Sequence, residues 1–176
     1  MKTASIIIIG NEILSGRTQD TNSNYLAKML VERGISLEEI RVIPDDHKII
    51  EDVVHKEASA KDYVFTSGGI GPTHDDITAE SIASCFDVPL SIREDAVELL
   101  AKNYQNGKKD LNEARLRMAR IPKGAKLIEN KISGAPGFII KNVFVMAGVP
   151  KIFEAMVQEI ILGLGSKNPI LSKTLK

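Results

Sequence analysis

The most constraining feature of the sequence is an alternation of short β-branched runs with segments of helical periodicity. Ala4–Ile9 is a short apolar β-branched run, and Ile35–Ile43 and Tyr63–Thr66 are further strand candidates. Between them, apolar residues recur at helical spacing, as over Tyr25–Leu30 and Ile49–Val54. This alternation predicts a parallel sheet with right-handed crossovers and helices on both faces. We therefore expect an α/β fold, a three-layer α/β/α arrangement around a mainly parallel sheet.

The middle of the chain carries a weaker pattern than its two ends. Residues 93–104 and 111–120 both have helical spacing, and a polar stretch separates them. Several short strand candidates follow over residues 125–147, and the buried run Val143–Met146 is the last of them. Pro150 is placed to begin a final helix, because proline fits the first helical turn.

Length and charge set limits on what the chain does. A chain of 176 residues suits one domain, which we place at residues 1–165, with residues 166–176 as a frayed tail or the start of a truncated region. The 23 basic and 23 acidic residues give a net charge of zero. This balance argues against a protein that wraps nucleic acid or lies on an anionic membrane, but it leaves room for a small phosphorylated metabolite as partner.

Cysteine content and the N-terminus predict a cytoplasmic protein. The chain has one cysteine, Cys85, so it cannot form an internal disulfide, and a reducing compartment is expected. The aliphatic run Ile6–Ile9 is far shorter than a membrane span. Lys2 before this run resembles the start of a signal peptide, but the charged residue Glu12 follows at once and no cleavage site is evident.

Glycines, hydroxyls and carboxylates follow the predicted strands directly. In an open parallel sheet, ligands bind beyond the carboxyl ends of the strands. The candidate ligand-binding residues at this edge are Gly10, Glu12, Asn22, Thr66, Ser67, Gly68, Gly69, Gly71, Thr73, Thr78 and Pro150. We expect these residues to converge and to hold a phosphorylated nucleotide or pterin.

The segment after the third strand is the most informative part of this edge. Its three glycines, Gly68, Gly69 and Gly71, let the backbone turn sharply and expose N–H groups to an anion such as phosphate. It is neither a Walker loop nor a dinucleotide fingerprint, because no Gly-Lys-Ser/Thr follows and His74 occupies the third glycine position. The alternative is a tight turn in which Asp75 and Asp76 cap the next helix.

Four aspartates at the same edge suggest a metal ion. Asp75 and Asp76 beside a bound phosphate would repel it unless a cation such as Mg²⁺ lies between them. Asp45 and Asp20 follow neighbouring strands and could join the site; each could also be a helix cap. We take Asp75, Asp76 and Asp20 as candidate metal ligands.

Other reactive residue types give weaker signals. The three histidines lack metal-ligand spacing, so zinc is not expected. Ser67 lies outside any nucleophile elbow. A basic group is either a solvated helix face or a lid that reaches a nucleotide. This group comprises Lys108, Lys109, Arg115, Arg117 and Arg120.

Taken together, the segments resemble the molybdopterin-binding (MoCF biosynthesis) domain family, and within it the N-terminal domain of competence/damage-inducible protein A (CinA). The molybdopterin-like domain fused to some FAD synthetases is similar too. The resemblance runs from about Ile6 to Met156. The segments that carry it are Gly10–Gly16 with Asp20–Asn22, Thr66–Pro72 with Asp75–Thr78, Ala135–Phe138, and Gly148–Pro150.

This resemblance implies a homo-oligomer, either a dimer or a trimer, and a phosphate-binding glycine loop. By motif, Asp45 and Asp76 match the two aspartates that assist Mg-ATP chemistry in the adenylyltransferase branch of the family, and they are the expected catalytic residues. The CinA-like branch implies hydrolysis of the pyrophosphate bond of ADP-ribose or FAD with Mg²⁺, Co²⁺ or Ni²⁺.

Two alternatives stay open. The first is a molybdopterin adenylyltransferase of molybdenum cofactor biosynthesis, with molybdopterin as its ligand. The second is a module that binds a pterin or nucleotide without chemistry. Asn11 favours the second, because many relatives have aspartate at this position and its loss removes one possible metal ligand.

Overall fold

The computed structural model describes residues 1–165, so the predicted tail at 166–176 lies outside the described residues. The strands are β1 (Lys2–Ile9), β2 (Ile35–Ile43), β3 (Tyr63–Ser67), β4 (Leu90–Ile92), β5 (Arg120–Pro122), β6 (Lys126–Ile128), β7 (Gly137–Ile140) and β8 (Val143–Met146). The helices are α1 (Asn11–Leu14), α2 (Asn22–Glu32), α3 (His47–Ala60), α4 (Thr78–Cys85), α5 (Glu94–Ala101), the 3₁₀ turn η1 (Gly107–Asp110), α6 (Glu113–Arg117) and α7 (Pro150–Ile161). None of the described helices is long and apolar enough to cross a membrane.

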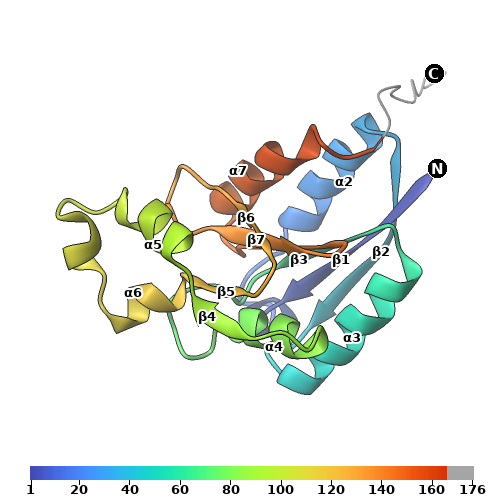
Figure 1. Ribbon diagram of the computed structural model, residues 1–176. Coiled ribbons are helices and arrows are strands. Elements are labelled where there is room, and N and C mark those ends of the chain that lie inside the picture. Colours follow the sequence, from blue (N-terminus) through green and yellow to red (C-terminus); the bar gives the residue numbers. More distant parts are fainter. Residues whose placement is uncertain (166–176) are drawn as a thin grey trace.

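A six-stranded sheet forms the centre of the molecule, in the order β2-β1-β3-β8-β7-β6. Strands β2, β1, β3 and β8 pair in parallel, whereas β7 is antiparallel to both of its neighbours. Helices α2 and α7 cover one face, and α3 and α4 cover the other (Figure 1). The expected three-layer α/β fold with a mainly parallel sheet is therefore confirmed.

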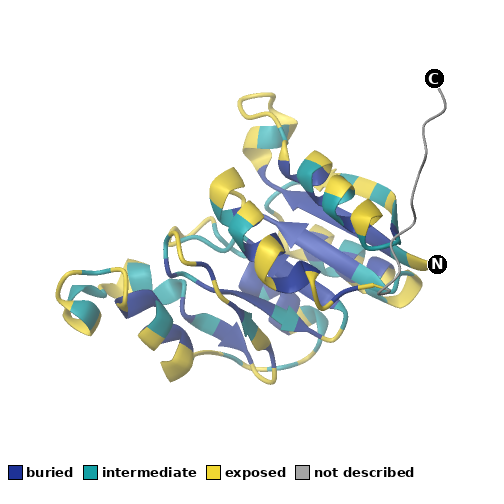
Figure 2. Ribbon diagram, turned by 90° about the horizontal axis from the view of Figure 1, so that it is seen from above, coloured by how far each residue is buried: buried dark blue, intermediate teal, exposed yellow. Residues whose placement is uncertain are grey.

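Alternation along β1 explains the two layers of packing. Ile6 and Ile8 pack under α2 and α7, whereas Ile7 and Ile9 pack against α3 and α4. Each of these four side chains is almost completely buried, because β1 lies between two parallel neighbours and both of its faces are covered. Figure 2 shows buried strands, in dark blue, at the centre of the molecule. A continuous aliphatic run is the pattern expected of such a strand.

The register of the parallel strands brings their carboxyl ends to one edge of the sheet. Ile9 lies beside Ile43, Ile8 lies beside Ser67, and Ser67 lies beside Met146. The chain leaves β1 toward β2 on one side and reaches β3 on the other, so the strand order reverses between β1 and β3. Ligands of open α/β sheets bind at such a switch point. We refer to this edge as the rim.

A small subdomain protrudes from the main body and corrects two helix predictions (Figure 1). The helix expected over residues 93–104 is α5, which ends at Ala101, and the one expected over 111–120 is the five-residue α6. After α5 the backbone N–H groups bond three residues back, and Gly107 takes a φ of +59°, so the chain turns instead of continuing. Arg120 pairs with Ile92 in a two-stranded antiparallel sheet.

The packing of α7 against the sheet gives a first prediction. Phe153 is fully buried among residues of α2 and the sheet, so replacing it with alanine leaves a large cavity. We expect Phe153→Ala to lower the free energy of unfolding by about 3–5 kcal/mol. Leu162, at the end of the same helix, is 77% exposed, and Leu162→Ala should cost less than about 0.5 kcal/mol. Urea unfolding of both variants checks this, and equal losses would contradict the assigned core.

Candidate functional site

Three connections from distant parts of the chain converge at the rim. The Asp45 carboxylate accepts a hydrogen bond from the Asn11 N–H at 3.0 Å, joining the ends of β2 and β1. The Asn22 side-chain amide donates to the Ser67 hydroxyl at 2.8 Å and to the Gly148 carbonyl at 2.9 Å, joining α2 to the ends of β3 and β8. Segments that the sequence predicts to follow separate strands therefore meet at one edge.

The glycine loop, residues 68–77, leaves β3 through two left-handed residues. Gly68 has a φ of +109° and Gly69 a φ of +72°. A side chain at Gly68 would collide with the Ile9 carbonyl of β1, and one at Gly69 would collide with the Thr78 hydroxyl. Both positions therefore require glycine for their backbone angle and for the close approach of the neighbouring element.

Thr78 holds the loop through two hydrogen bonds. Its hydroxyl donates to the Gly68 carbonyl at 3.0 Å, and its N–H donates to the Gly69 carbonyl at 2.9 Å. Thr78 and Thr66, two of the predicted ligand-binding residues, are fully buried. The Gly68 and Gly69 carbonyls are thus occupied, which leaves N–H groups of the loop to interact with a ligand.

Consecutive N–H groups of this loop have no acceptor within the described residues. The Gly68 N–H donates to the Met146 carbonyl. The next three, from Gly69, Ile70 and Gly71, donate to no group in residues 1–165, although all three residues are half-buried. Half-buried N–H groups normally find a partner, and successive free ones favour an anion.

The structure corrects the predicted caps of the next helix. Helix α4 begins at Thr78, and within the described residues no side chain caps it. The Asp76 carboxylate instead turns back into the loop and accepts from the Thr73 N–H and hydroxyl, both at 2.8 Å. Asp75 extends into solvent and pairs with exposed His74 at 3.3 Å. Asp76 lies two positions before the first residue of the helix, and its carboxylate bonds to the loop rather than to the helix.

The remaining predicted carboxylates lie around the start of the first two helices. The side chain of Glu12 folds over Gly10, where a Cβ atom would lie 2.6 Å from its carboxylate. Asp20 accepts from the Asn22 N–H at 2.9 Å and also binds Ser23, so it serves the first turn of α2. The α3 cap is Asp46, whose carboxylate accepts from the Ile49 N–H at 3.0 Å, which leaves Asp45 at the rim.

These carboxylates do not form a preassembled metal cage. No group of three His, Cys, Asp or Glu side chains in residues 1–165 is arranged to hold an ion, so Asp75, Asp76 and Asp20 are not gathered as one ligand set. The donor set fits a different kind of site, in which one or two carboxylates hold Mg²⁺ and ligand phosphates complete its coordination.

Two clefts flank the glycine loop. The β1/β3 cleft lies at the switch point and includes Ile8, Ile9, Glu12, Asn22, Ser67, Gly148 and Pro150 in its lining. The arginine cleft lies on the other side and includes Ile70, Gly71, Asp76, Arg117, Arg120 and Phe138. Ser67, the last residue of β3, lines the first cleft, whereas Ile70 and Gly71 of the glycine loop line the second.

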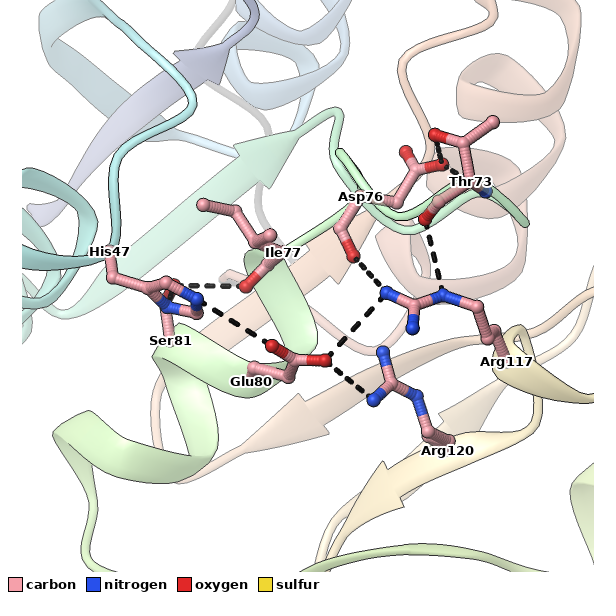
Figure 3. A network of polar contacts seen from close by, with 8 residues as sticks. All are labelled: His47, Thr73, Asp76, Ile77, Glu80, Ser81, Arg117 and Arg120. Atoms are coloured by element: carbon pink, nitrogen blue, oxygen red, sulfur yellow. Dashed lines mark hydrogen bonds and ion pairs between the residues drawn. The ribbon is translucent and has the colours of Figure 1, made fainter. Parts of the chain in front are cut away.

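Glu80, which pairs with both arginines of this cleft, is a residue that sequence reasoning missed. Its carboxylate lies 2.5 Å from Arg120, 3.7 Å from Arg117 and 3.6 Å from His47 (Figure 3). Its position two residues after Thr78, in the first turn of a helix, was the one available signal. The predicted basic group is thereby divided: Arg117 and Arg120 turn to Glu80, whereas Arg115 stacks on Tyr104 and Lys108 pairs with Glu94.

The sequence of this chain is similar to those of known proteins. Residues 5–172 match the family model described as a probable molybdopterin binding domain. A protein of Archaeoglobus fulgidus is 41% identical over 156 residues, which cover 89% of this chain and 66% of that protein. A CinA-like protein of Sulfurihydrogenibium is 38% identical over 159 residues, covering 87% of this chain and 40% of that protein. The chain therefore spans two thirds or less of the length of these relatives.

The fold of this chain is also similar to those of solved structures. The CinA protein from Thermoplasma acidophilum matches with a TM-score of 0.84 and 38% identity, covering 92% of this chain and 97% of that one. The molybdopterin biosynthesis enzyme MoaB from Thermus thermophilus matches with a TM-score of 0.60 and 16% identity, covering 93% and 92%. At this low identity, the second match speaks for the fold.

The glycine loop yields a prediction with a matched control. Gly69 and Gly16 have nearly the same φ, +72° and +73°, but a side chain meets Thr78 at Gly69 and open space at Gly16. Gly16→Ala should lose about 1–2 kcal/mol of stability from backbone strain. We expect Gly69→Ala to lose about 1–3 kcal/mol more, because the added methyl group overpacks the loop. Thermal or urea unfolding measures the difference, and equal losses would mean that Thr78 does not hold the loop closely.

Proposed function

Because the chain belongs to the molybdopterin-binding domain family, we propose that it binds a phosphorylated nucleotide or pterin at the rim and hydrolyses a pyrophosphate bond with the help of a divalent metal ion. The proposal rests on one observation, the run of N–H groups at Gly69, Ile70 and Gly71 that have no acceptor within residues 1–165. Such groups are oriented before the ligand arrives, so they stabilise phosphoryl charge without reorganisation.

The charges of the site explain the need for a metal. Asp76 lies against Gly71, within 2.8 Å of the position that a Cβ atom would occupy there, and Asp45 and Glu12 lie near the end of β1. A phosphate among these carboxylates is favourable when a cation compensates the repulsion. Asp76 and Asp45 are the residues that we assign to this ion, which would supply Lewis-acid chemistry and an activated water.

This chain's own residues have separate tasks in the proposal. The three N–H groups of Gly69–Gly71 bind phosphate oxygens, and Thr78 keeps the loop in its left-handed conformation. Asp76, fixed by Thr73, holds its carboxylate at a defined place beside the loop. In the β1/β3 cleft, Ile13 and Pro150 offer apolar surface to the ring of a nucleoside or pterin.

Hydrolysis is tested on ADP-ribose and FAD with Mg²⁺, Co²⁺ and Ni²⁺ in turn, using release of AMP as the readout. We expect turnover with at least one metal, and we expect Asp76→Asn to lower it by at least about a hundredfold. Asparagine keeps an oxygen that can accept from Thr73, so the loop should stay folded. Asp52→Asn is the control, because Asp52 lies on the exposed side of α3 and pairs with Lys48.

The outcomes separate the proposal from its alternatives. AMP transfer to molybdopterin with little release into water would replace hydrolysis by an adenylyltransferase reaction. Tight calorimetric binding without turnover under any metal would make the chain a binding module. Absence of both binding and turnover across the panel would overturn the proposal.

A further inference from the structure

The arginine cleft carries a second inference, which rests on the proposed function and refines it. Its cationic residues, Arg117 and Arg120, come from α6 and β5 of the protruding subdomain. They face Gly71 and Asp76, which belong to the glycine loop. Figure 3 shows both guanidinium groups beside Glu80, with Arg117 directed toward Asp76 and Thr73. Glu80 of α4 and Arg120 of β5 are 40 residues apart in the chain and thus belong to one polar cluster.

Arg117 has hydrogen-bonding capacity that the protein does not use. Its Nε–H donates to the Thr73 carbonyl at 3.2 Å, and its Nη2 lies 3.5 Å from the Asp76 carbonyl and 3.7 Å from Glu80. The two Nη2 contacts are long, and Nη1 has no partner in residues 1–165. A guanidinium carries five N–H donors in a planar fork that suits phosphate, so Arg117 is held in place with donors to spare.

Arg120 and Glu80 set the charge of the cluster. Arg120 binds the Glu80 carboxylate at 2.5 Å, and its buried Nε has no hydrogen-bond partner in the described residues. The charged side chains in the cleft lining are two arginines and one aspartate, so the lining has an excess of positive charge. Glu80 lies behind them and offsets the charge of Arg120 more closely than that of Arg117.

Gly71 connects this cleft to the phosphate-binding loop. Its N–H is the last of the three free amides, and the same residue lines the arginine cleft beside Arg117. A phosphate held on the loop amides therefore has the Arg117 side chain as a neighbour. The Arg117 side chain is 26% exposed, so a second, linked phosphate can reach its guanidinium group from solvent.

We propose that Arg117 is a specificity-determining residue that binds the second phosphate of a diphosphate ligand whose first phosphate lies on the Gly69–Gly71 amides. The site then prefers ligands with two linked phosphates to monophosphates. Glu80 is a positioning residue that holds the arginine pair against the loop. The ligand class is a nucleoside diphosphate or a molecule that contains one.

Calorimetry with AMP and with α,β-methylene-ADP, whose phosphates cannot be separated by hydrolysis, tests the preference in the presence of Mg²⁺. We expect the wild-type chain to bind the diphosphate at least about tenfold more tightly than AMP, because a hydrogen-bonded charge pair contributes about that much. Arg117→Gln should remove this preference and leave AMP binding unchanged.

Two further variants distinguish a specific role of Arg117 from an effect of general charge or of misfolding. Arg115→Gln is the matched control, because Arg115 lies on the same helix but binds the Asp110 carbonyl and stacks on Tyr104. It should keep the full preference for the diphosphate. Arg117→Lys keeps the charge and should keep part of the preference, and it decides the question if Arg117→Gln does not fold.

Each result has a distinct meaning. Equal affinity of the wild-type chain for the two nucleotides would overturn the role of Arg117 while leaving the proposed binding site in place. Equal loss in the Arg115 and Arg117 variants would assign the preference to general charge and overturn the inference. A wild-type chain that binds neither nucleotide would instead contradict the proposed function.

Discussion

The close contact between the glycine loop and the end of β1 is the constraint on which the site depends. Gly68 approaches the Ile9 carbonyl so closely that no side chain fits between them. This approach is possible because β1 and β3 are parallel neighbours whose ends lie at the same height. Thr78 bonds to both glycine carbonyls, and in this arrangement the next N–H groups of the loop have no partner in the described residues.

Opposite charges surround this loop in an ordered way. Carboxylates of Glu12 and Asp45 lie near the end of β1, Asp76 lies against the loop itself, and the arginine pair lies beyond it. Free amides and arginines favour an anion, whereas the carboxylates favour a cation. A phosphate with a divalent ion satisfies both, and this is why we link binding of a phosphorylated ligand to a metal.

Local sequence patterns predicted the parts of the fold that local patterns determine. The strands at Ile35–Ile43 and Val143–Met146 have the predicted bounds. Gly34 and Pro44 delimit the first, and the second is a continuous apolar run. The edge of the sheet where the polar segments meet followed from the predicted parallel order. The helix over 93–104 was predicted too long, since its polar second half has no core to pack against and turns at Gly107.

The roles of several site residues depend on tertiary contacts, which local sequence patterns do not reveal. Asp76 looked like a helix cap, but its partner is Thr73 within the loop, and the helix starts later. Glu80 showed no motif of its own, because its arginine partners come from a separate subdomain. Thr66 and Thr78 looked like ligand-binding hydroxyls, and only the structure shows that both are fully buried.

The central claim, that the free amides of the glycine loop bind an anion, is tested most directly by nuclear magnetic resonance of the ¹⁵N-labelled chain. Titration with inorganic pyrophosphate and Mg²⁺ should shift the amide signals of Gly69, Ile70 and Gly71 most strongly, with one common dissociation constant. Signals of Leu99 and Asn103, which line a separate hollow near Gly134, should stay in place. Unchanged loop signals at saturating pyrophosphate, or larger shifts at Leu99 and Asn103, would contradict the account.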